Sequence, residues 1–173
     1  VASTHSAYGV TVKGGEGTDT LSVGEDESAA AFGIYSEFET LLLAAAGTAY
    51  DLRDFGNNTF TTVAVGGVGA TTVTGAGSEV FCINDNMTGD FTITKVDATG
   101  SSDVVNIKVQ TDSNGNATDT TNEFVLTGFE TINLESDDNL TTNGNLENTA
   151  QLNAANATTL TITGDSGLTI GAA

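Results

Sequence analysis

The chain contains neither proline nor tryptophan, and only one cysteine and one histidine, among its 173 residues. Without proline, strands can run without breaks in the hydrogen-bond ladder of a sheet. A single cysteine, Cys82, excludes an internal disulfide and with it a small module held together by disulfides. Because Cys82 lies between Phe81 and Ile83 in a short apolar run, we expect a buried thiol without a catalytic role.

Basic residues are also scarce, with 4 Lys and Arg against 23 Asp and Glu and a formal net charge of -19. Phosphate contacts need cationic side chains, so we expect no binding to nucleic acid or to an anionic membrane surface. No apolar run reaches the roughly 18 residues that a membrane-spanning helix needs, so we also expect no membrane insertion. Cations are the natural partners of such an acidic chain.

Hydrophobic residues nevertheless make up 38% of the chain, and they recur at every second position in short runs. This alternation is typical of strands with one buried face, and it indicates a folded chain. Gly, Asn and Asp separate the runs, as expected for turns. The pattern predicts an all-β fold with strands at residues 9–13, 19–23, 38–43, 59–65, 70–74, 79–83, 90–96, 103–109, 123–127, 130–134, 158–163 and 167–170.

Three sequence patterns each occur twice, in the same order along the chain. The clearest is Phe-Glu-Thr-aliphatic-x-Leu, at residues 38–43 and 129–134. An Asp-led strand pattern precedes each copy, at 19–23 and 103–109. A Thr-rich run that ends in Gly follows each copy, at 62–67 and 159–164. We therefore predict two related β units, residues 1–97 and 98–173, stacked as one continuous domain. The matched positions of Glu39 and Glu130 predict a structural role, such as accepting backbone N–H bonds at a turn.

Twelve short strands are compatible with a β-sandwich or with a solenoid. A sandwich built from hairpins should show two-residue Asn-Gly or Asp-Gly loops between its strands. The Gly-rich linkers in this sequence have lengths and repeats more like the stacked coils of a parallel β-helix. We predict a parallel β-helix or β-solenoid with Gly- and Asp-rich turns, and keep a β-sandwich as the alternative.

Residues 14–21 match the calcium-binding nonapeptide G-G-x-G-x-D-x-(large aliphatic)-x almost throughout. Its glycines let the backbone turn with positive φ so that carbonyl oxygens converge, and the Asp carboxylate completes an oxygen cage around a hard cation. A plain turn before a strand is the alternative interpretation. A degenerate second copy without the paired glycines covers residues 100–105. The metal-ligating residues predicted from these two segments are Gly14, Gly15, Gly17, Asp19 and Asp103.

A second candidate cation site covers residues 112–123, where oxygen-bearing side chains follow the spacing of a calcium loop. Ala117 stands where that motif requires glycine, and the flanking segments read as strands, which excludes an EF-hand. A polar loop between two strands is the alternative. The candidate ligands are Asp112, Asn114, Asn116, Thr118 and Glu123.

Acidic residues also gather in short clusters, of which Glu135–Asp138 follows one of the predicted strands. Such clusters are commonly solvated turns. Like charges at this spacing repel one another, however, and a divalent cation would relieve the repulsion. We therefore add Asp137 and Asp138 to the candidate metal ligands.

Together, these segments give the chain a family resemblance. The nonapeptide at residues 14–21, the strand at 102–107, the phrase at 128–134 and the closing run at 159–164 resemble bacterial surface-layer proteins of the repeat-in-toxin type. The resemblance is strongest over residues 95–170, and a weaker copy covers residues 12–75. It implies a calcium-dependent β-solenoid that is exported by type I secretion and assembles into a lattice on the cell surface.

Three classes of function follow as hypotheses. The first is a structural protein of a calcium-dependent extracellular layer or filament, with other copies of itself as the main partner and cell-surface polysaccharide as a further candidate. The second is an extracellular adhesin or carbohydrate-binding module. The third and least favoured is a secreted polysaccharide-degrading enzyme, because no set of catalytic residues stands out in the sequence. We therefore expect the protein not to be an enzyme.

Overall fold

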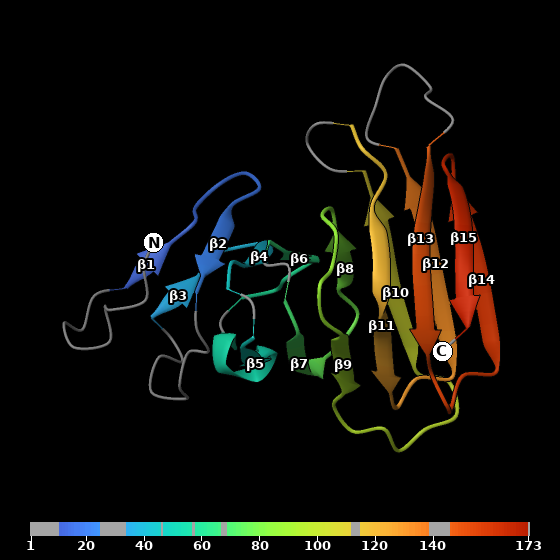
Figure 1. Ribbon diagram of the computed structural model, residues 1–173. Coiled ribbons are helices and arrows are strands. Elements are labelled where there is room, and N and C mark those ends of the chain that lie inside the picture. The colour runs from blue at the N-terminus through green and yellow to red at the C-terminus, as the bar shows by residue number, and fades with distance from the viewer. Residues whose placement is uncertain are drawn as a thin grey trace.

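The computed structural model describes residues 11–24, 34–45, 47–56, 58–66, 69–111, 115–138 and 146–172, without the side chains of 119–121 and 172. In these residues the chain is almost entirely β-structure, with one short 3-10 helix, η3 (Leu52–Phe55). Figure 1 shows the strands of the two main sheets stacked from β2 at one end to β14 and β15 at the other. None of these described residues forms a helix with the length and hydrophobicity that a membrane-spanning helix requires.

Two large sheets contain nearly all of the strands. The seven-stranded sheet consists of β2 (Thr20–Val23), β4 (Thr40–Leu43), β6 (Thr62–Val65), β8 (Val80–Ile83), β10 (Val104–Gln110), β12 (Thr131–Asp137) and β14 (Thr159–Gly164). The six-stranded sheet consists of β5 (Ala49–Asp51), β7 (Thr71–Ala76), β9 (Phe91–Lys95), β11 (Asp119–Thr127), β13 (Glu147–Asn153) and β15 (Gly167–Ala172). A small third sheet pairs β1 (Val12–Lys13) with β3 (Tyr35–Ser36).

The chain alternates between the two large sheets from β4 onward. We call one strand of the seven-stranded sheet and the following strand of the six-stranded sheet a coil. Each strand of the seven-stranded sheet after β4 pairs in parallel with the corresponding strand of the preceding coil. Parallel pairing with alternation between two sheets is the geometry of a β-solenoid, because hairpins would pair consecutive strands antiparallel. The predicted parallel β-solenoid is confirmed, and the β-sandwich alternative is wrong.

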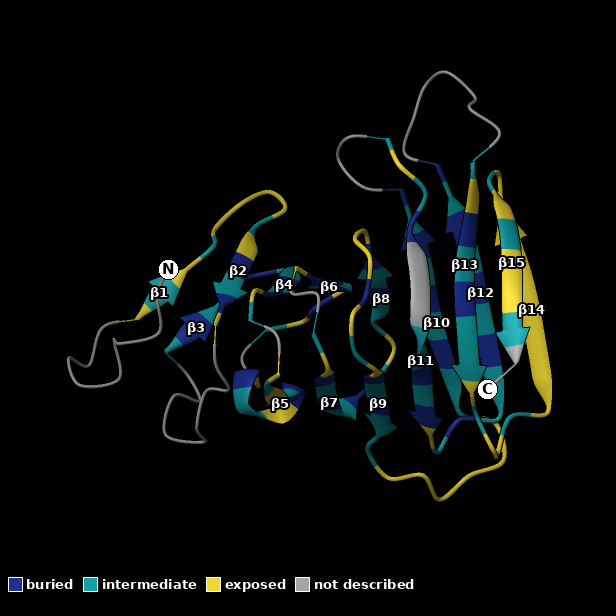
Figure 2. Ribbon diagram, in the orientation of Figure 1, coloured by how far each residue is buried: buried dark blue, intermediate teal, exposed yellow. Residues whose placement is uncertain are grey.

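Alternating side chains explain why these short segments form strands. In β4, β6 and β8 every second residue is buried, and the buried residues are aliphatic or aromatic. Their inward rows fill the space between the two sheets, while the outward rows are partly exposed (Figure 2). The outward residues of these three strands are Thr40, Leu42, Thr62, Ala64, Val80 and Cys82. The middle of the core contains an aromatic stack in which the Phe91 ring centroid lies 6.0 Å from that of Phe81 and 6.3 Å from that of Phe124.

The two sequence repeats occupy matching places in the seven-stranded sheet. Strands β2, β4 and β6 recur in order as β10, β12 and β14, and β8 lies between the two sets. Register continues across β8, since Phe81 pairs with Val63 on one side and with Ile107 on the other. Both sets of strands therefore belong to one uninterrupted sheet.

The strand predictions fail where inward residues are not aliphatic or where a strand is very short. The pattern did not predict β3, β5 or β13, and residues 9 and 10 of the first predicted strand lie outside the described part. The prediction of a buried Cys82 is also wrong. Inward positions in β8 belong to Phe81 and Ile83, so Cys82 lies on the outer face, half-buried, and its Sγ donates to Gln110 Oε1 at 3.1 Å. Partial burial raises the pKa of the Cys82 thiol.

Candidate metal centre

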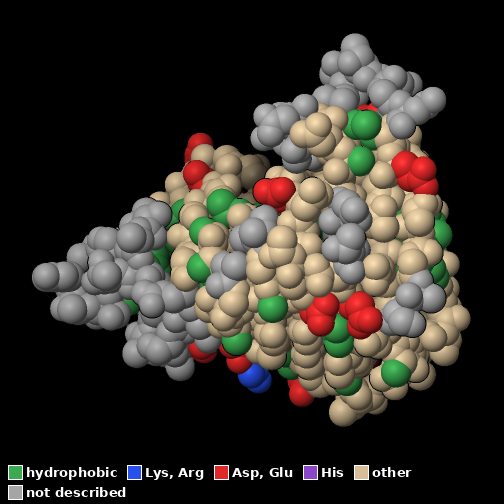
Figure 3. Space-filling view, in the orientation of Figure 1, with side chains coloured by type: hydrophobic (Ala, Val, Ile, Leu, Met, Phe, Trp, Pro, Cys, Tyr) green, Lys and Arg blue, Asp and Glu red, His purple; other side chains and the backbone are tan. Residues whose placement is uncertain are grey.

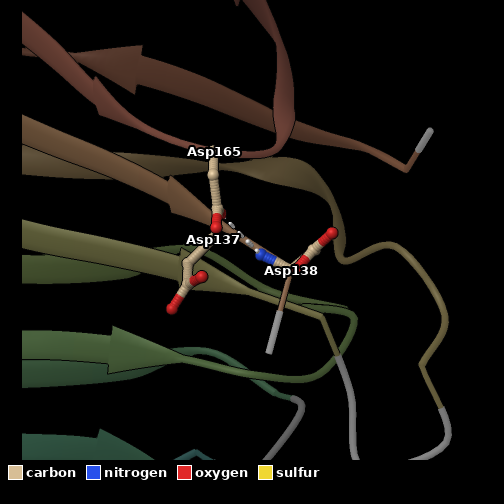
Figure 4. Close-up of side chains that lie close together, drawn as sticks. All are labelled: Asp137, Asp138 and Asp165. Carbon is tan, nitrogen blue, oxygen red and sulfur yellow. Dashed lines mark hydrogen bonds between the residues drawn. The ribbon is translucent and has the colours of Figure 1, made fainter. Parts of the chain in front are cut away.

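Three aspartates from neighbouring coils come together at one corner of the solenoid. Asp137 ends β12, Asp138 follows it, and Asp165 lies in the turn between β14 and β15. Each offers a carboxylate oxygen within 4.8 Å of the others, and the Asp138 N–H donates to Asp165 Oδ1 at 3.4 Å (Figure 4). A group of three carboxylates at this spacing can bind a metal ion, because each supplies a negatively charged oxygen ligand.

Asn148 of β13 fixes the backbone beneath this corner. It is completely buried, and its Nδ2 donates to Val109 O at 3.3 Å, Ser136 Oγ at 3.1 Å and Asp137 O at 3.3 Å. Its Oδ1 accepts from the Thr118 N–H at 2.9 Å. One side chain thus ties β13 to three neighbouring segments and holds the main chain of Asp137 from the core side.

Lys108 influences the charge of the cluster from the outer face of the sheet. Its Nζ lies 2.5 Å from Asp137 Oδ2 and 3.1 Å from Glu135 Oε1. The hydrogen bond from Lys108 holds the pKa of Asp137 below its usual range, although partial burial acts in the opposite direction. Burial alone would lower the pKa of Lys108, but its bonds to Asp137 and Glu135 outweigh this effect and raise it. At neutral pH the Asp137 carboxylate is therefore ionised. Its Oδ2 is bonded to Lys108 and also accepts from Gln110 Nε2 at 3.2 Å, so a cation would have to compete with these two donors for this oxygen.

The predicted glycine-rich turn forms where the nonapeptide places it. Gly15 and Gly17 have φ of 103° and 123°, values that L side chains rarely adopt. At Gly14 an added Cβ would lie 1.9 Å from the Glu37 carbonyl oxygen, so only glycine fits. The turn delivers Asp19 to the start of β2, where its Oδ2 is buried and has no hydrogen-bond partner among the described residues.

The second copy reproduces this arrangement around Asp103. The Asp19 N–H donates to Glu39 Oε2, and the Asp103 N–H donates to Glu130 Oε2, both at 2.9 Å. Asp103 Oδ2 is also buried without a hydrogen-bond partner in the described part of the chain. The predicted role of Glu39 and Glu130 as acceptors of backbone N–H bonds is confirmed. In each Asp–Glu pair, the Asp carboxylate oxygen without a hydrogen-bond partner lies at the corner where a coil begins.

Glu130→Ala is expected to lower the free energy of unfolding by about 1–3 kcal/mol, because the part-buried Asp103 N–H loses its acceptor. Glu130→Gln keeps an acceptor oxygen and should cost less. Urea denaturation monitored by circular dichroism measures both values. The exposed Glu16→Ala is the control and should leave the unfolding midpoint unchanged. A Glu130→Ala variant as stable as the parent would contradict the structural role.

The described residues of the second predicted site bond to different neighbours. Asp112 and Asn114 lie outside the described residues. Thr118 is buried, and its hydroxyl donates to Gln110 O. Glu123 belongs to β11, and its Oε2 accepts from Asn153 Nδ2 of β13 at 2.8 Å. Asn116 lies in the connection before β11 and also makes a contact. Thr118 and Glu123 therefore have structural partners, and neither joins the three-aspartate group.

Sequence reasoning identified Asp137 and Asp138 but missed Asp165, Lys108 and Asn148. Asp165 had a recognisable signal, since Gly164-Asp165-Ser166-Gly167 forms the turn between the last two predicted strands. Lys108 and Asn148 had none, because their roles depend on which strands are neighbours.

Comparison with known proteins provides no independent assignment of this site. No protein-family model matches the chain, and no curated protein matches it. The candidate centre is therefore defined by its own geometry.

Proposed function

We propose that the chain is a structural subunit, or a segment of one, in a calcium-dependent layer or filament outside the cell. The observation that carries the proposal is the group of Asp137, Asp138 and Asp165, which joins the last two coils of the solenoid. A cation bound there would tie the turn after β14 to the end of β12. The bound cation would therefore stabilise the packing of one coil on the next.

The ligand chemistry favours calcium. All three candidate ligands are carboxylates, which suit hard cations, and calcium accepts six to eight oxygen ligands in flexible geometry. The buried Oδ2 atoms of Asp19 and Asp103 give two further corners where a cation would find an unpaired oxygen. Main-chain oxygens and water would have to complete each coordination shell.

The overall charge supports an extracellular setting. Figure 3 shows Asp and Glu side chains dispersed over one face of the molecule, with far fewer basic side chains. A chain of net charge -19 is destabilised by self-repulsion where free calcium is scarce. Millimolar calcium outside the cell would reduce this repulsion and add binding free energy to folding. Folding and assembly would then follow export, as the resemblance to repeat-in-toxin surface-layer proteins implies.

Circular dichroism combined with light scattering on metal-stripped protein tests this proposal. We expect calcium to increase the β signal and then the scattering, and magnesium to be much less effective because it requires stricter octahedral geometry. β-structure that is complete in chelator, with no assembly on adding calcium, would reject the proposal and favour an adhesin domain.

A pair of matched variants connects the response to the candidate centre. Asp137→Asn with Asp165→Asn removes two of the three carboxylates, so the calcium midpoint of the folding signal should rise roughly tenfold or more. Asp54→Asn with Asp97→Asn makes the same change in net charge outside the cluster and should leave that midpoint nearly unchanged. Equal shifts in both pairs would attribute the response to overall charge instead.

A further inference from the structure

The corner that holds the three aspartates has an inner side lined by buried polar side chains. With the exception of Thr71 on β7, the buried polar and charged residues of the described part of the chain all belong to this lining. The core elsewhere in the described part is apolar, so the polar lining is a local feature of this corner. Its members are Thr111, Thr118, Ser136, Asp138 and Asn148.

Hydrogen bonds account for the hydroxyl groups of this lining, with one exception. The Ser136 hydroxyl accepts a hydrogen bond from Asn148 Nδ2 at 3.1 Å. The Thr118 hydroxyl donates to Gln110 O. Thr111 Oγ1, in contrast, is buried and has no hydrogen-bond partner among the described residues. An unpaired buried hydroxyl is costly, and in a native protein it indicates a partner of another kind, such as an ion or a water molecule.

Thr111 and Asp138 are neighbours across the seven-stranded sheet. Gln110 pairs with Asp137, and the Thr111 N–H donates to Asp137 O at 3.2 Å, which continues the ladder by one residue. Thr111 therefore lies beside Asp138 on the adjacent strand, at a strand spacing of about 4.8 Å. In β10 and β12 every second residue is buried, and these two residues continue the buried sets. They are 0% and 4% exposed, so both side chains lie on the inner side of the corner.

The three carboxylates of the cluster differ in how accessible they are to a cation. Asp137 faces outward, and its Oδ2 already bonds to Lys108 and to Gln110 Nε2. Asp138 lies on the inner side, and its N–H bonds to the Asp165 carboxylate from the next coil. Asp138 makes a further contact, but the two oxygens of a carboxylate accept about four partners between them. The inner side of the cluster is therefore the better place for a cation.

We propose that the Thr111 hydroxyl is a ligand of the cation at this corner, together with the carboxylates of Asp138 and Asp165. Calcium takes neutral as well as charged oxygen ligands and needs six to eight of them. A hydroxyl has two lone pairs for a cation and one proton for an acceptor. The same contact thus gives the cation a fixed oxygen and gives the buried hydroxyl its partner.

This ligand extends the reach of the site along the solenoid. Thr111 follows β10, Asp138 follows β12 and Asp165 follows β14, so the three residues occupy the same corner of three successive coils. A cation held by all three would couple three coils instead of the last two. The inference rests on the proposed function because both place a cation at this corner, but it concerns one ligand and not the assembly.

Urea denaturation followed by circular dichroism, at a series of free calcium concentrations, tests the ligand. Thr111→Val keeps the shape of the side chain and removes the hydroxyl. At the lowest calcium concentration that keeps the protein folded, this variant should be at least as stable as the parent, because the lost hydroxyl had no partner. The calcium concentration that gives half of the stabilisation should rise roughly tenfold, as is usual when a metal site loses a supporting group.

Two further variants separate a ligand from a buried structural hydroxyl. Thr111→Ser keeps the hydroxyl, so it should lose similar stability at every calcium concentration and keep the calcium midpoint of the parent. Thr71→Val removes a buried hydroxyl that donates to Gly69 O at 3.3 Å, and it should also lose stability equally throughout. Thr111→Val would overturn the proposal if it behaved like Thr71→Val, or if its calcium midpoint equalled that of the parent.

Light scattering on the same samples separates this inference from the proposed function. Calcium-driven assembly of the parent, with an unchanged calcium midpoint in Thr111→Val, would reject the ligand and leave the proposed function intact. A raised midpoint in Thr111→Val, with a parent chain that binds calcium but does not assemble, would keep the ligand and reject the proposed function. A parent chain whose stability does not depend on calcium would reject both.

Discussion

Asn148→Ala is expected to lower the free energy of unfolding by about 3 kcal/mol. The side chain is completely buried, and it satisfies the Thr118 N–H while donating to Val109 O and Asp137 O. Alanine leaves these buried groups without their partner, and each unsatisfied group costs about 1–3 kcal/mol, offset where another partner or water substitutes. Guanidinium denaturation, with the unfolding midpoint read by circular dichroism, measures the loss.

Asn153→Ala is the matched control for this experiment. Asn153 lies on the same strand, is exposed, and bonds through Nδ2 to Glu123 Oε2. Its removal should cost less than about 1 kcal/mol, as is usual for surface substitutions. Similar losses for both variants would show that Asn148 is not the centre of a buried network. Because Asn148 also holds the main chain of Asp137, its alanine variant should require more calcium for folding than the Asn153 variant does.

The period-2 pattern predicts this fold well wherever the core is aliphatic. In β10 the inward residues Val105, Ile107 and Val109 are all nearly inaccessible, and the predicted strand differs from the observed one by a single residue at each end. Strand β13 carries no such signal, because its buried inward positions are Asn148 and Ala150. It becomes a strand because β11 and β15 pair with it on both sides. Neighbouring strands therefore decide its structure, and local sequence does not.

The candidate centre shows the same division between local and long-range information. The sequence repeats were sufficient to align Asp19 with Asp103 and Glu39 with Glu130, and the structure gives both pairs the same backbone hydrogen bond. Asp165 lies 27 residues after Asp138, and only the length of one complete coil brings the two together. This proximity cannot be predicted from the sequence unless the coil boundaries are known.

Phe91→Ala is expected to cost about 3–5 kcal/mol, the usual range for deleting a buried phenylalanine. The ring lies between Phe81 of its own coil and Phe124 of the next, so alanine also removes two edge-to-face contacts. Urea denaturation monitored by both circular dichroism and tyrosine fluorescence measures the loss. Phe91→Leu fills most of the volume and should retain more of the stability. The outward Thr92→Ala on the same strand is the surface control.

The shape of the Phe91→Ala transition also tests whether the two repeat units form one domain. Phe91 belongs to the unit at residues 1–97, and Phe124 belongs to the unit at 98–173, so their contact crosses the predicted boundary. Coils of a solenoid are stabilised mainly by their nearest neighbours, which makes this contact part of the coupling between the units. If the continuous sheets couple them fully, the midpoint should fall with an unchanged denaturant slope and both probes should agree. Two separate transitions would instead show that each repeat unit unfolds independently once the aromatic stack is removed.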